Sequence, residues 1–239
     1  MAAPALAGNL PIISNDAARS LQIFSDLVAR ASAAPCLRQS RAMRLIPKFL
    51  LSATSPDHFP PPTAPEVAFL GRSNVGKSSL LNALVGSKQA HVSSTPGRTQ
   101  AINFFALQEA AASIQPVLLF ADLPGYGYAK ISKSISAEWP KFIEPYLALR
   151  PTLALCICLV DSKIPPQESD QKLIHYLKEI GRPFVVVGTK ADRLSGNERT
   201  KSAAALKRAL GVDEILLCSA KTELGMKELW ARLRAIAAT

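Results

Sequence analysis

The chain has 239 residues, of which 48% are hydrophobic and 19% charged, so it can bury one good core and belongs to the ordinary globular class. Its 28 Lys and Arg residues exceed its 18 Asp and Glu residues, and the formal charge of +10 favours a polyanionic partner such as nucleic acid without identifying one. No apolar run reaches the roughly 18 residues of a membrane span, and the N-terminus lacks the features of a secretory signal.

Four cysteines do not make a disulfide framework at this chain length. Cys156 and Cys158 lie in the apolar run LALCICLVD, where we interpret them as small core residues of a buried strand rather than as a metal or redox pair. The three histidines show no ligand spacing. This cysteine usage indicates a reducing compartment.

The first 65 residues differ in composition from the rest of the chain. Residues 1–42 are rich in alanine, carry few charges and have no clear apolar period, so we expect a disordered extension there. Residues 43–65 predict an N-terminal segment and linker, in which a short apolar run precedes a proline-rich connector without regular structure. The remaining residues, 66–239, are predicted to form one domain.

Strands and helices alternate from residue 66 onward. Apolar runs, several of them rich in β-branched residues, predict strands at 66–70, 102–106, 116–121, 152–160, 183–188 and 214–218. Helical patterns lie at 77–86, within 131–149, and at 166–180, 197–210 and 225–237. This order predicts an α/β fold with a mostly parallel sheet covered by helices on both faces. The short segment between 106 and 116 has room only for a hairpin turn, so we expect one antiparallel edge strand.

The sequence GRSNVGKS matches the phosphate-loop pattern G-x-x-x-x-G-K-[ST] at Gly71, Gly76, Lys77 and Ser78. Glycines let backbone N–H groups turn toward phosphate oxygens, and the following helix presents its positive N-terminus. We expect Lys77 to face the β- and γ-phosphates, since it has no other evident partner, and the Ser78 hydroxyl to ligate Mg²⁺. A preceding strand and a following helix favour this interpretation over a chance match.

Two further motifs indicate that the base is guanine. In GTKAD, at the end of a predicted strand, the Asp192 carboxylate can accept hydrogen bonds from guanine N1–H and the exocyclic amine, a donor pair that adenine lacks. The stem of Lys190 is expected to lie over the base. In SAK, the backbone N–H groups of Ser219, Ala220 and Lys221 are candidates for the guanine O6. Either motif alone is weak, but together after a phosphate loop they favour GTP over ATP.

Two loops are candidates for nucleotide-sensing switches. DLPG follows a predicted strand, so we expect Asp122 to bind Mg²⁺ through water and the Gly125 N–H to sense the γ-phosphate. A turn acid before a flexible loop is the alternative. In the polar loop SSTPGRTQ, Thr99 is the better candidate for a second Mg²⁺ hydroxyl and Thr95 the runner-up.

These motifs resemble the EngB (YihA/YsxC) family of translation-factor-related P-loop GTPases. The resemblance is carried by GRSNVGKSSLLNAL, TPGRTQAINFF, DLPGYGYAK, GTKADRL and SAK, and it covers the chain roughly from Arg44 onward. It implies a Ras-like domain that binds GTP and GDP with Mg²⁺ and hydrolyses GTP slowly. It further implies a switch in large ribosomal subunit assembly, with rRNA and ribosomal proteins as partners, a monomeric state and a requirement in normal cell division and septation.

The resemblance assigns GTP contacts to five segments. They are the phosphate loop (Gly71, Arg72, Ser73, Asn74, Val75, Gly76, Lys77, Ser78 and Ser79), the first switch (Gly97, Arg98, Thr99, Gln100 and Ala101), the second switch (Asp122, Leu123, Pro124 and Gly125), and the two base-binding segments (Thr189, Lys190, Ala191 and Asp192; Cys218, Ser219, Ala220 and Lys221). Ser78 and Thr99 are the implied Mg²⁺ ligands. Lys77, Thr99 and Asn74 are the implied catalytic residues.

One position departs from the Ras-like enzymes that orient water with a glutamine. That glutamine follows the D-x-x-G glycine, but Tyr126 stands there in this chain. We therefore expect slow intrinsic hydrolysis that needs a partner, a monovalent ion or another residue. Asn74 matches related GTPases that bind potassium beside the phosphates, so K⁺ is a candidate assistant.

The first 42 residues depart most from the bacterial members, which start close to Met43. Either the chain begins upstream of the true start, or the extension is a targeting or accessory tail. Asp16 and Asp26 argue against an acid-poor transit peptide, so we prefer the bacterial cytoplasm to an organelle.

Two functions of different classes remain open. One is the ribosome-assembly GTPase; the other is a signalling module with negligible turnover that acts through a protein effector. The basic charge favours the first, because loops near the γ-phosphate carry cations that ribosomal RNA would neutralise. These cations are Arg98, Lys130 and Lys133, followed by Lys141 and Arg150 in the next segment; a solvated charged face is the alternative.

Overall fold

The computed structural model describes residues 45–86, 101–109, 115–126, 141 and 143–238. All of them belong to one compact unit, Gln39–Thr239. The extension expected at 1–42 and the helical pattern expected before residue 141 lie outside the described residues.

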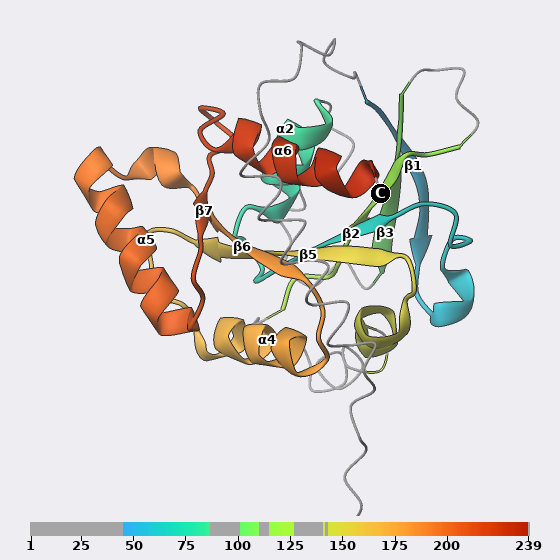
Figure 1. Ribbon diagram of the computed structural model, residues 1–239, viewed down its shortest axis with the longest axis horizontal. Helices are drawn as coiled ribbons and strands as arrows, with labels where there is room; N and C mark the ends of the chain where they lie inside the picture. Colours follow the sequence, from blue (N-terminus) through green and yellow to red (C-terminus); the bar gives the residue numbers. More distant parts are fainter. Residues whose placement is uncertain (1–44, 87–100, 110–114, 127–140, 142, 239) are drawn as a thin grey trace, which may run out of the picture. The chain divides into compact units, whose positions relative to one another are not determined.

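A seven-stranded sheet runs through this unit in the spatial order β1-β3-β4-β2-β5-β6-β7 (Figure 1). The strands are β1 (Ile46–Ala53), β2 (Glu66–Gly71), β3 (Ile102–Gln108), β4 (Leu118–Asp122), β5 (Leu153–Asp161), β6 (Phe184–Thr189) and β7 (Leu216–Leu217). β2 pairs in parallel with β4 and β5, and β6 pairs in parallel with β5 and β7. β3 is antiparallel to both of its neighbours, β1 and β4. The expected α/β fold with a mostly parallel sheet and an antiparallel strand is confirmed, but the antiparallel strand β3 is not at the sheet edge as expected, because β1 lies outside it.

The strand β1 was not among the predicted strands; it lies within the N-terminal segment expected at 43–65. It pairs with β3, for example Phe49 with Phe105, and so lies outside β3 at the sheet edge. Its apolar residues do not alternate cleanly, because the register shifts between Phe49 and Leu51 and much of the strand is exposed. Pro47 is tolerated because an edge strand can leave one N–H side unpaired. The proline-rich connector also contains one 3₁₀ turn, η1 (Pro56–His58), where irregular structure was expected.

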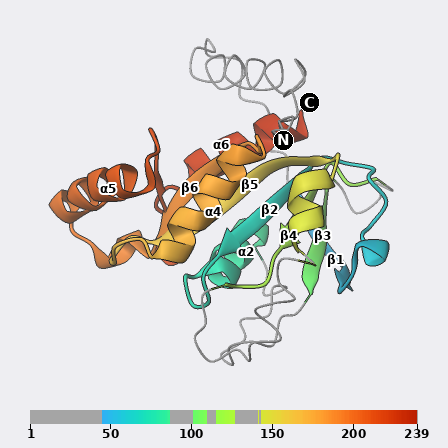
Figure 2. The same cartoon turned by 90° about the horizontal axis from the view of Figure 1, so that it is seen from below.

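In the described part of the chain, four helices and one shorter helical segment cover the sheet. They are α2 (Lys77–Val85), α4 (Glu168–Glu179), α5 (Gly196–Leu210) and α6 (Met226–Ala237), with helical residues at 143–149 and a 3₁₀ turn η2 at Ala191–Arg193. α2 and α6 lie on one face, and α4 with residues 143–149 on the other (Figures 1 and 2). The six strands and four of the five helices predicted from residue 66 onward form, with ends displaced by at most two residues. Of the fifth, predicted within 131–149, residues 143–149 are helical.

The alternation of side chains in β2 shows how the two faces are filled. Phe69 contacts Phe120 of β4, which in turn contacts Trp230 of α6. Leu70 belongs to the opposite core, with Tyr146 and the α4 residues Leu173, Ile174 and Leu177. Every residue of β2 is buried, so the position at which the following loop begins is fixed by the packing of the strand. Cys156 and Cys158 are buried free thiols of β5 in this second core, as expected for small core residues.

Candidate functional site

The phosphate loop connects the buried end of β2 with the N-terminus of α2. Asn74 and Gly76 have left-handed φ angles of 65° and 104°, which reverse the chain direction between the two elements. At Gly71 there is no room for a side chain, because a Cβ would lie 2.8 Å from Val75 Cγ1 and 3.1 Å from the Leu159 carbonyl oxygen. Gly76 is the N-cap of α2, so Lys77 and Ser78 occupy the first turn with its N–H groups. This arrangement has the strand-loop-helix context that an anion-binding loop requires.

Lys77 forms an ion pair with Asp122, which corrects the expectation that it has no partner besides phosphate. Asp122 is the last residue of β4 and lies opposite Phe69 of the adjacent β2. The side chains of Lys77 and Asp122 are only 11% and 7% exposed, so each limits the cost of burying the other's charge. Two residues 45 positions apart in sequence therefore meet at the carboxyl edge of the sheet.

The segment after Asp122 lies directly on the phosphate loop. A Cβ on Gly125 would lie 2.9 Å from Ser73 Oγ and 3.1 Å from Ser73 N, so only glycine fits without displacement. The Ser73 N–H donates to the Tyr126 carbonyl oxygen at 3.1 Å, and Arg72 and Tyr126 form a parallel bridge. The structure thus brings the second-switch residues and the phosphate loop into contact.

The Tyr126 side chain is turned toward α4. Its hydroxyl donates to Asp170 Oδ1 at 3.1 Å, and Arg72 Nε donates to Asp170 Oδ2 at 3.2 Å. Burial, followed by the nearby charge of Asp170, raises the pKa of Tyr126 well above its usual value, so the phenol keeps its proton. Asp170 was missed in the sequence because it belongs to no nucleotide motif; its only local signal is a position in the first turn of α4.

The end of β6 is tied to the phosphate loop by two side chains. Thr189 Oγ1 lies 2.6 Å from the Val75 carbonyl oxygen and can donate to it. Lys190 has a left-handed φ of 59°, and its Nζ donates to the Asn74 carbonyl oxygen at 2.9 Å. The same Nζ pairs with Asp161 at the end of β5, at 2.7 Å. Asp161 is a second residue that the motifs did not reveal.

Asp192 and Ser219 meet at the ends of β6 and β7. Ser219 Oγ donates to Asp192 Oδ1 at 2.7 Å, and this bond holds the pKa of the Asp192 carboxyl below its ordinary value. Of the three N–H groups considered for the guanine O6, that of Ser219 donates to the Leu224 carbonyl oxygen and that of Lys221 to Ser219 Oγ. The two base-binding segments predicted from sequence are therefore adjacent.

Arg150 is not an exposed cation of the kind expected to face RNA. Its guanidinium donates to Glu66 Oε1 from Nε at 2.8 Å and to the Pro60 carbonyl oxygen at 2.6 Å. Glu66 is fully buried and also accepts from Tyr146 and Thr152. Lys141, in contrast, is exposed.

Several predicted residues lie outside the described part of the chain. They are Thr95, Gly97, Arg98, Thr99, Gln100, Lys130 and Lys133. Ala101 is described and directly precedes β3. Among the described residues no group of three His, Cys, Asp or Glu side chains is placed to hold a metal, and no helix is long and apolar enough to span a membrane.

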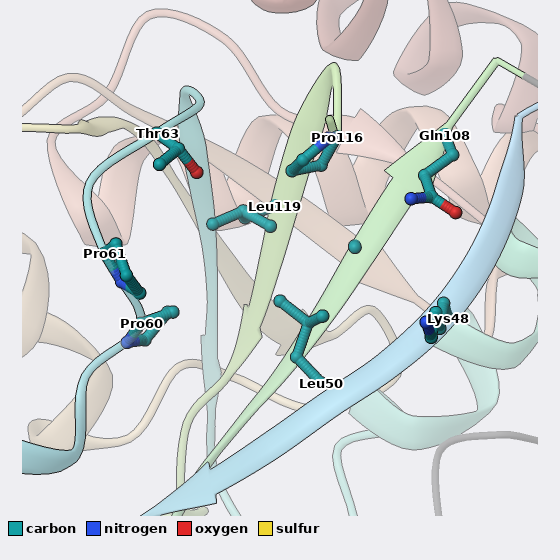
Figure 3. Close-up of a pocket in the computed structure, with 9 residues that line it drawn as sticks. Lys48, Leu50, Pro60, Pro61, Thr63, Gln108, Pro116 and Leu119 are labelled. Atoms are coloured by element: carbon teal, nitrogen blue, oxygen red, sulfur yellow. The ribbon is translucent and has the colours of Figure 1, made fainter. Parts of the chain in front are cut away.

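A separate pocket of about 220 Å³ lies between β1, β3, β4 and the segment before β2 (Figure 3). Leu50, Leu119, Pro60 and Pro116 give it an apolar lining, with Lys48 at its side. Pro116 precedes β4, so the pocket is at the opposite end of that strand from Asp122. It does not belong to the nucleotide site.

Comparison with known proteins gives concordant matches. A family model described as "50S ribosome-binding GTPase" matches residues 66–190. A "Probable GTP-binding protein EngB" of Acidobacterium capsulatum is 70% identical over 196 residues, covering 82% of this chain and 93% of the relative. The protein of the same name from Koribacter versatilis is 55% identical over 197 residues, covering 82% and 97%.

Solved structures agree with the fold. The crystal structure of a probable GTP-binding protein engB aligns with a TM-score of 0.59 at 21% identity, covering 72% of this chain and 98% of that one. Aquifex aeolicus Era bound to GDP and AlF₄⁻ aligns with a TM-score of 0.59 at 22% identity, covering 73% and 57%.

Proposed function

The chain belongs to the EngB family of GTP-hydrolysing P-loop proteins, and we propose that it acts as a GTP-dependent switch in assembly of the large ribosomal subunit. The 50S ribosome-binding description of the model that matches residues 66–190 supports this proposal most directly. The formal charge of +10 agrees with an RNA-containing partner. We place the protein in the bacterial cytoplasm as a monomer, and normal cell division and septation depend on it through the supply of ribosomes.

The phosphate groups are bound by the loop between β2 and α2. This assignment is supported by the left-handed backbone at Asn74 and Gly76, which turns the loop into the N-terminus of α2, so that both can contact the same anion. Lys77 leaves Asp122 and pairs with the β- and γ-phosphates when a nucleotide binds. The hydroxyls of Ser78 and Thr99 would hold Mg²⁺, which would neutralise phosphate charge, and Asp122 would interact with the ion through water.

The base is read by the segments that meet at Asp192 and Ser219. The Asp192 carboxylate accepts from guanine N1–H and the exocyclic amine, and Ser219 fixes its orientation. The Ala220 N–H faces the guanine O6, since those of Ser219 and Lys221 are used within their own loop. Thr189 and Lys190 hold this half of the site against the phosphate loop.

Intrinsic hydrolysis is slow because the position after Gly125 cannot orient water. Tyr126 directs its hydroxyl to Asp170 of α4 and keeps its proton there. The transition state then needs stabilisation from elsewhere. Lys77 would supply positive charge and Thr99 a hydroxyl, and a potassium ion held beside Asn74 would add further positive charge. Contact with the ribosomal particle supplies the remaining stabilisation of the transition state.

Depletion of the protein in its own bacterium tests this function. Sucrose-gradient profiles should lose mature large subunits and gain a lighter precursor before growth slows. The wild-type chain should restore the profile, and a chain with Asp192→Asn should not. Normal profiles together with altered signalling responses would favour the effector-binding module instead.

A further inference from the structure

Asp170 joins three parts of the molecule although it lies in no nucleotide motif. Its carboxylate accepts from the Tyr126 hydroxyl at 3.1 Å, from Arg72 Nε at 3.2 Å and from the Gln167 N–H at 2.9 Å. It is 1% exposed and lies in the first turn of α4. A buried carboxylate with this many donors is held firmly in one position.

Two of these donors come from segments that contact one another. Arg72 belongs to the phosphate loop, and Tyr126 follows the second-switch glycine Gly125. Their backbones form a parallel bridge, and the Tyr126 N–H lies 3.4 Å from the Gly71 carbonyl oxygen. Tyr126 is thus bound through its backbone to the phosphate loop and through its side chain to α4. Gly125, one residue earlier, is held against Ser73 by the same contacts.

We propose that Asp170 is a positioning residue for γ-phosphate recognition, which acts through Tyr126 and Arg72 to hold the Gly125 N–H beside the phosphate loop. Preorganisation of this donor favours the nucleotide that carries a γ-phosphate, whereas GDP makes no contact with it. The inference rests on the assignment of Gly125 as the γ-phosphate sensor.

A purely structural role would have a different consequence. Elsewhere in the same domain the buried Tyr146 hydroxyl donates to Glu66 Oε2 at 2.8 Å, which is the same type of bond. Glu66 begins β2, whereas the phosphate loop follows the end of that strand. Loss of the Tyr146 bond should lower stability and affect GTP and GDP binding equally. Tyr146→Phe is therefore a matched control for Tyr126→Phe.

The test compares the dissociation constants of GDP and of a non-hydrolysable GTP analogue, measured by titration calorimetry on the full chain. Tyr126→Phe should weaken analogue binding about tenfold relative to GDP, the size expected for one lost hydrogen bond to a charged group. The ratio of the GDP dissociation constant to the analogue dissociation constant measures the preference for the GTP analogue. Tyr146→Phe should leave this ratio unchanged. In an Asp170→Ala background, which lacks the acceptor, Tyr126→Phe should change this ratio less than about twofold, because the two side chains act through one contact.

An unchanged or increased preference for the GTP analogue in Tyr126→Phe overturns the proposal. Gly125→Ala separates it from the sensor assignment, because the added Cβ displaces the peptide from Ser73. If Gly125→Ala lowers the ratio and Tyr126→Phe does not, Gly125 is the sensor and Asp170 does not position it. If Gly125→Ala leaves this ratio unchanged, both the assignment of Gly125 as the γ-phosphate sensor and the positioning role of Asp170 are contradicted.

Discussion

We propose that guanine selectivity depends on Asp192, whose carboxylate is held in place by Ser219. Asp192→Asn reverses the hydrogen-bond polarity toward the base, so GTP affinity should fall and xanthosine triphosphate affinity should rise. Each lost bond to the carboxylate should cost about 1.5–3 kcal/mol. Titration with both nucleotides measures this, with the exposed Asp213→Asn as a control. Unchanged GTP affinity in Asp192→Asn would contradict the assignment.

Lys77 contributes to the fold as well as to the site, because it pairs with the buried Asp122. Lys77→Ala should abolish stabilisation by GTP. It should also lower the free energy of unfolding without nucleotide by about 1–3 kcal/mol, since the Asp122 carboxylate loses its partner. Adding Asp122→Asn should recover much of this loss. Urea denaturation of the two single variants and the double variant measures the coupling, and a Lys77→Ala protein as stable as the wild type would contradict it.

Asn74 and Tyr126 together lead to an expected potassium dependence. We propose that Tyr126 cannot place the attacking water and that the side-chain amide oxygen of Asn74, on the loop to which we assign phosphate binding, contacts the ion. GTP hydrolysis should therefore be faster in KCl than in NaCl at equal ionic strength, and Asn74→Ala should reduce the difference. Equal rates of phosphate release in the two salts would contradict a role of potassium and would mean that only the ribosomal particle stimulates hydrolysis.

At the scale of elements, the buried ion pair between Arg150 and Glu66 fixes helical residues 143–149 and β2 in relation to the 60–65 segment. Arg150→Ala should lower the free energy of unfolding by about 3 kcal/mol, because it leaves a buried carboxylate without its cation. Binding of ribosomal particles at temperatures where the variant is folded should not change. Lys141→Ala, at an exposed position, should leave stability unaltered. If the Arg150→Ala protein is as stable as the wild type but binds particles poorly, Arg150 contacts RNA instead of stabilising the fold.

The regular strands and helices from Glu66 onward could be predicted because their patterns are local. Strand β1 could not, since it is an edge strand with Pro47, a register shift and many exposed residues, and so lacks the alternation that marks a half-buried strand. Its existence depends on pairing with β3, which is about 50 residues away in sequence.

The segments to which we assign nucleotide binding could also be recognised in the sequence, because phosphate and guanine recognition require fixed residue types at fixed spacing. The contacts between these segments could not. Lys77 with Asp122, Lys190 with Asp161 and Tyr126 with Asp170 each join residues from different elements. Nothing in the local sequence distinguishes Asp161 and Asp170 from solvated acids, and the motif that marks Asp122 does not reveal its pairing with Lys77.

For the whole molecule, the formal charge of +10 implies long-range attraction to polyanions. Lys130 and Lys133, which follow the second-switch residues in sequence, are our candidates for cations that read the nucleotide state at the ribosome. Reversal of both to Glu should abolish binding to large-subunit particles and leave nucleotide affinity within about twofold. Filter binding with labelled nucleotide and co-sedimentation with particles measure the two properties separately. Loss of nucleotide binding in this variant would instead place the lysines in the GTP site.

The central claim is that bound GTP controls attachment to the large ribosomal subunit. Its most direct test is co-sedimentation of the purified protein with purified large-subunit particles, with a non-hydrolysable GTP analogue or with GDP, between about 50 mM and 200 mM salt. We expect tighter binding with the analogue than with GDP, and a steep loss of affinity as salt increases, because each neutralised phosphate releases counterions. Binding that is the same with both nucleotides and independent of salt would contradict the account.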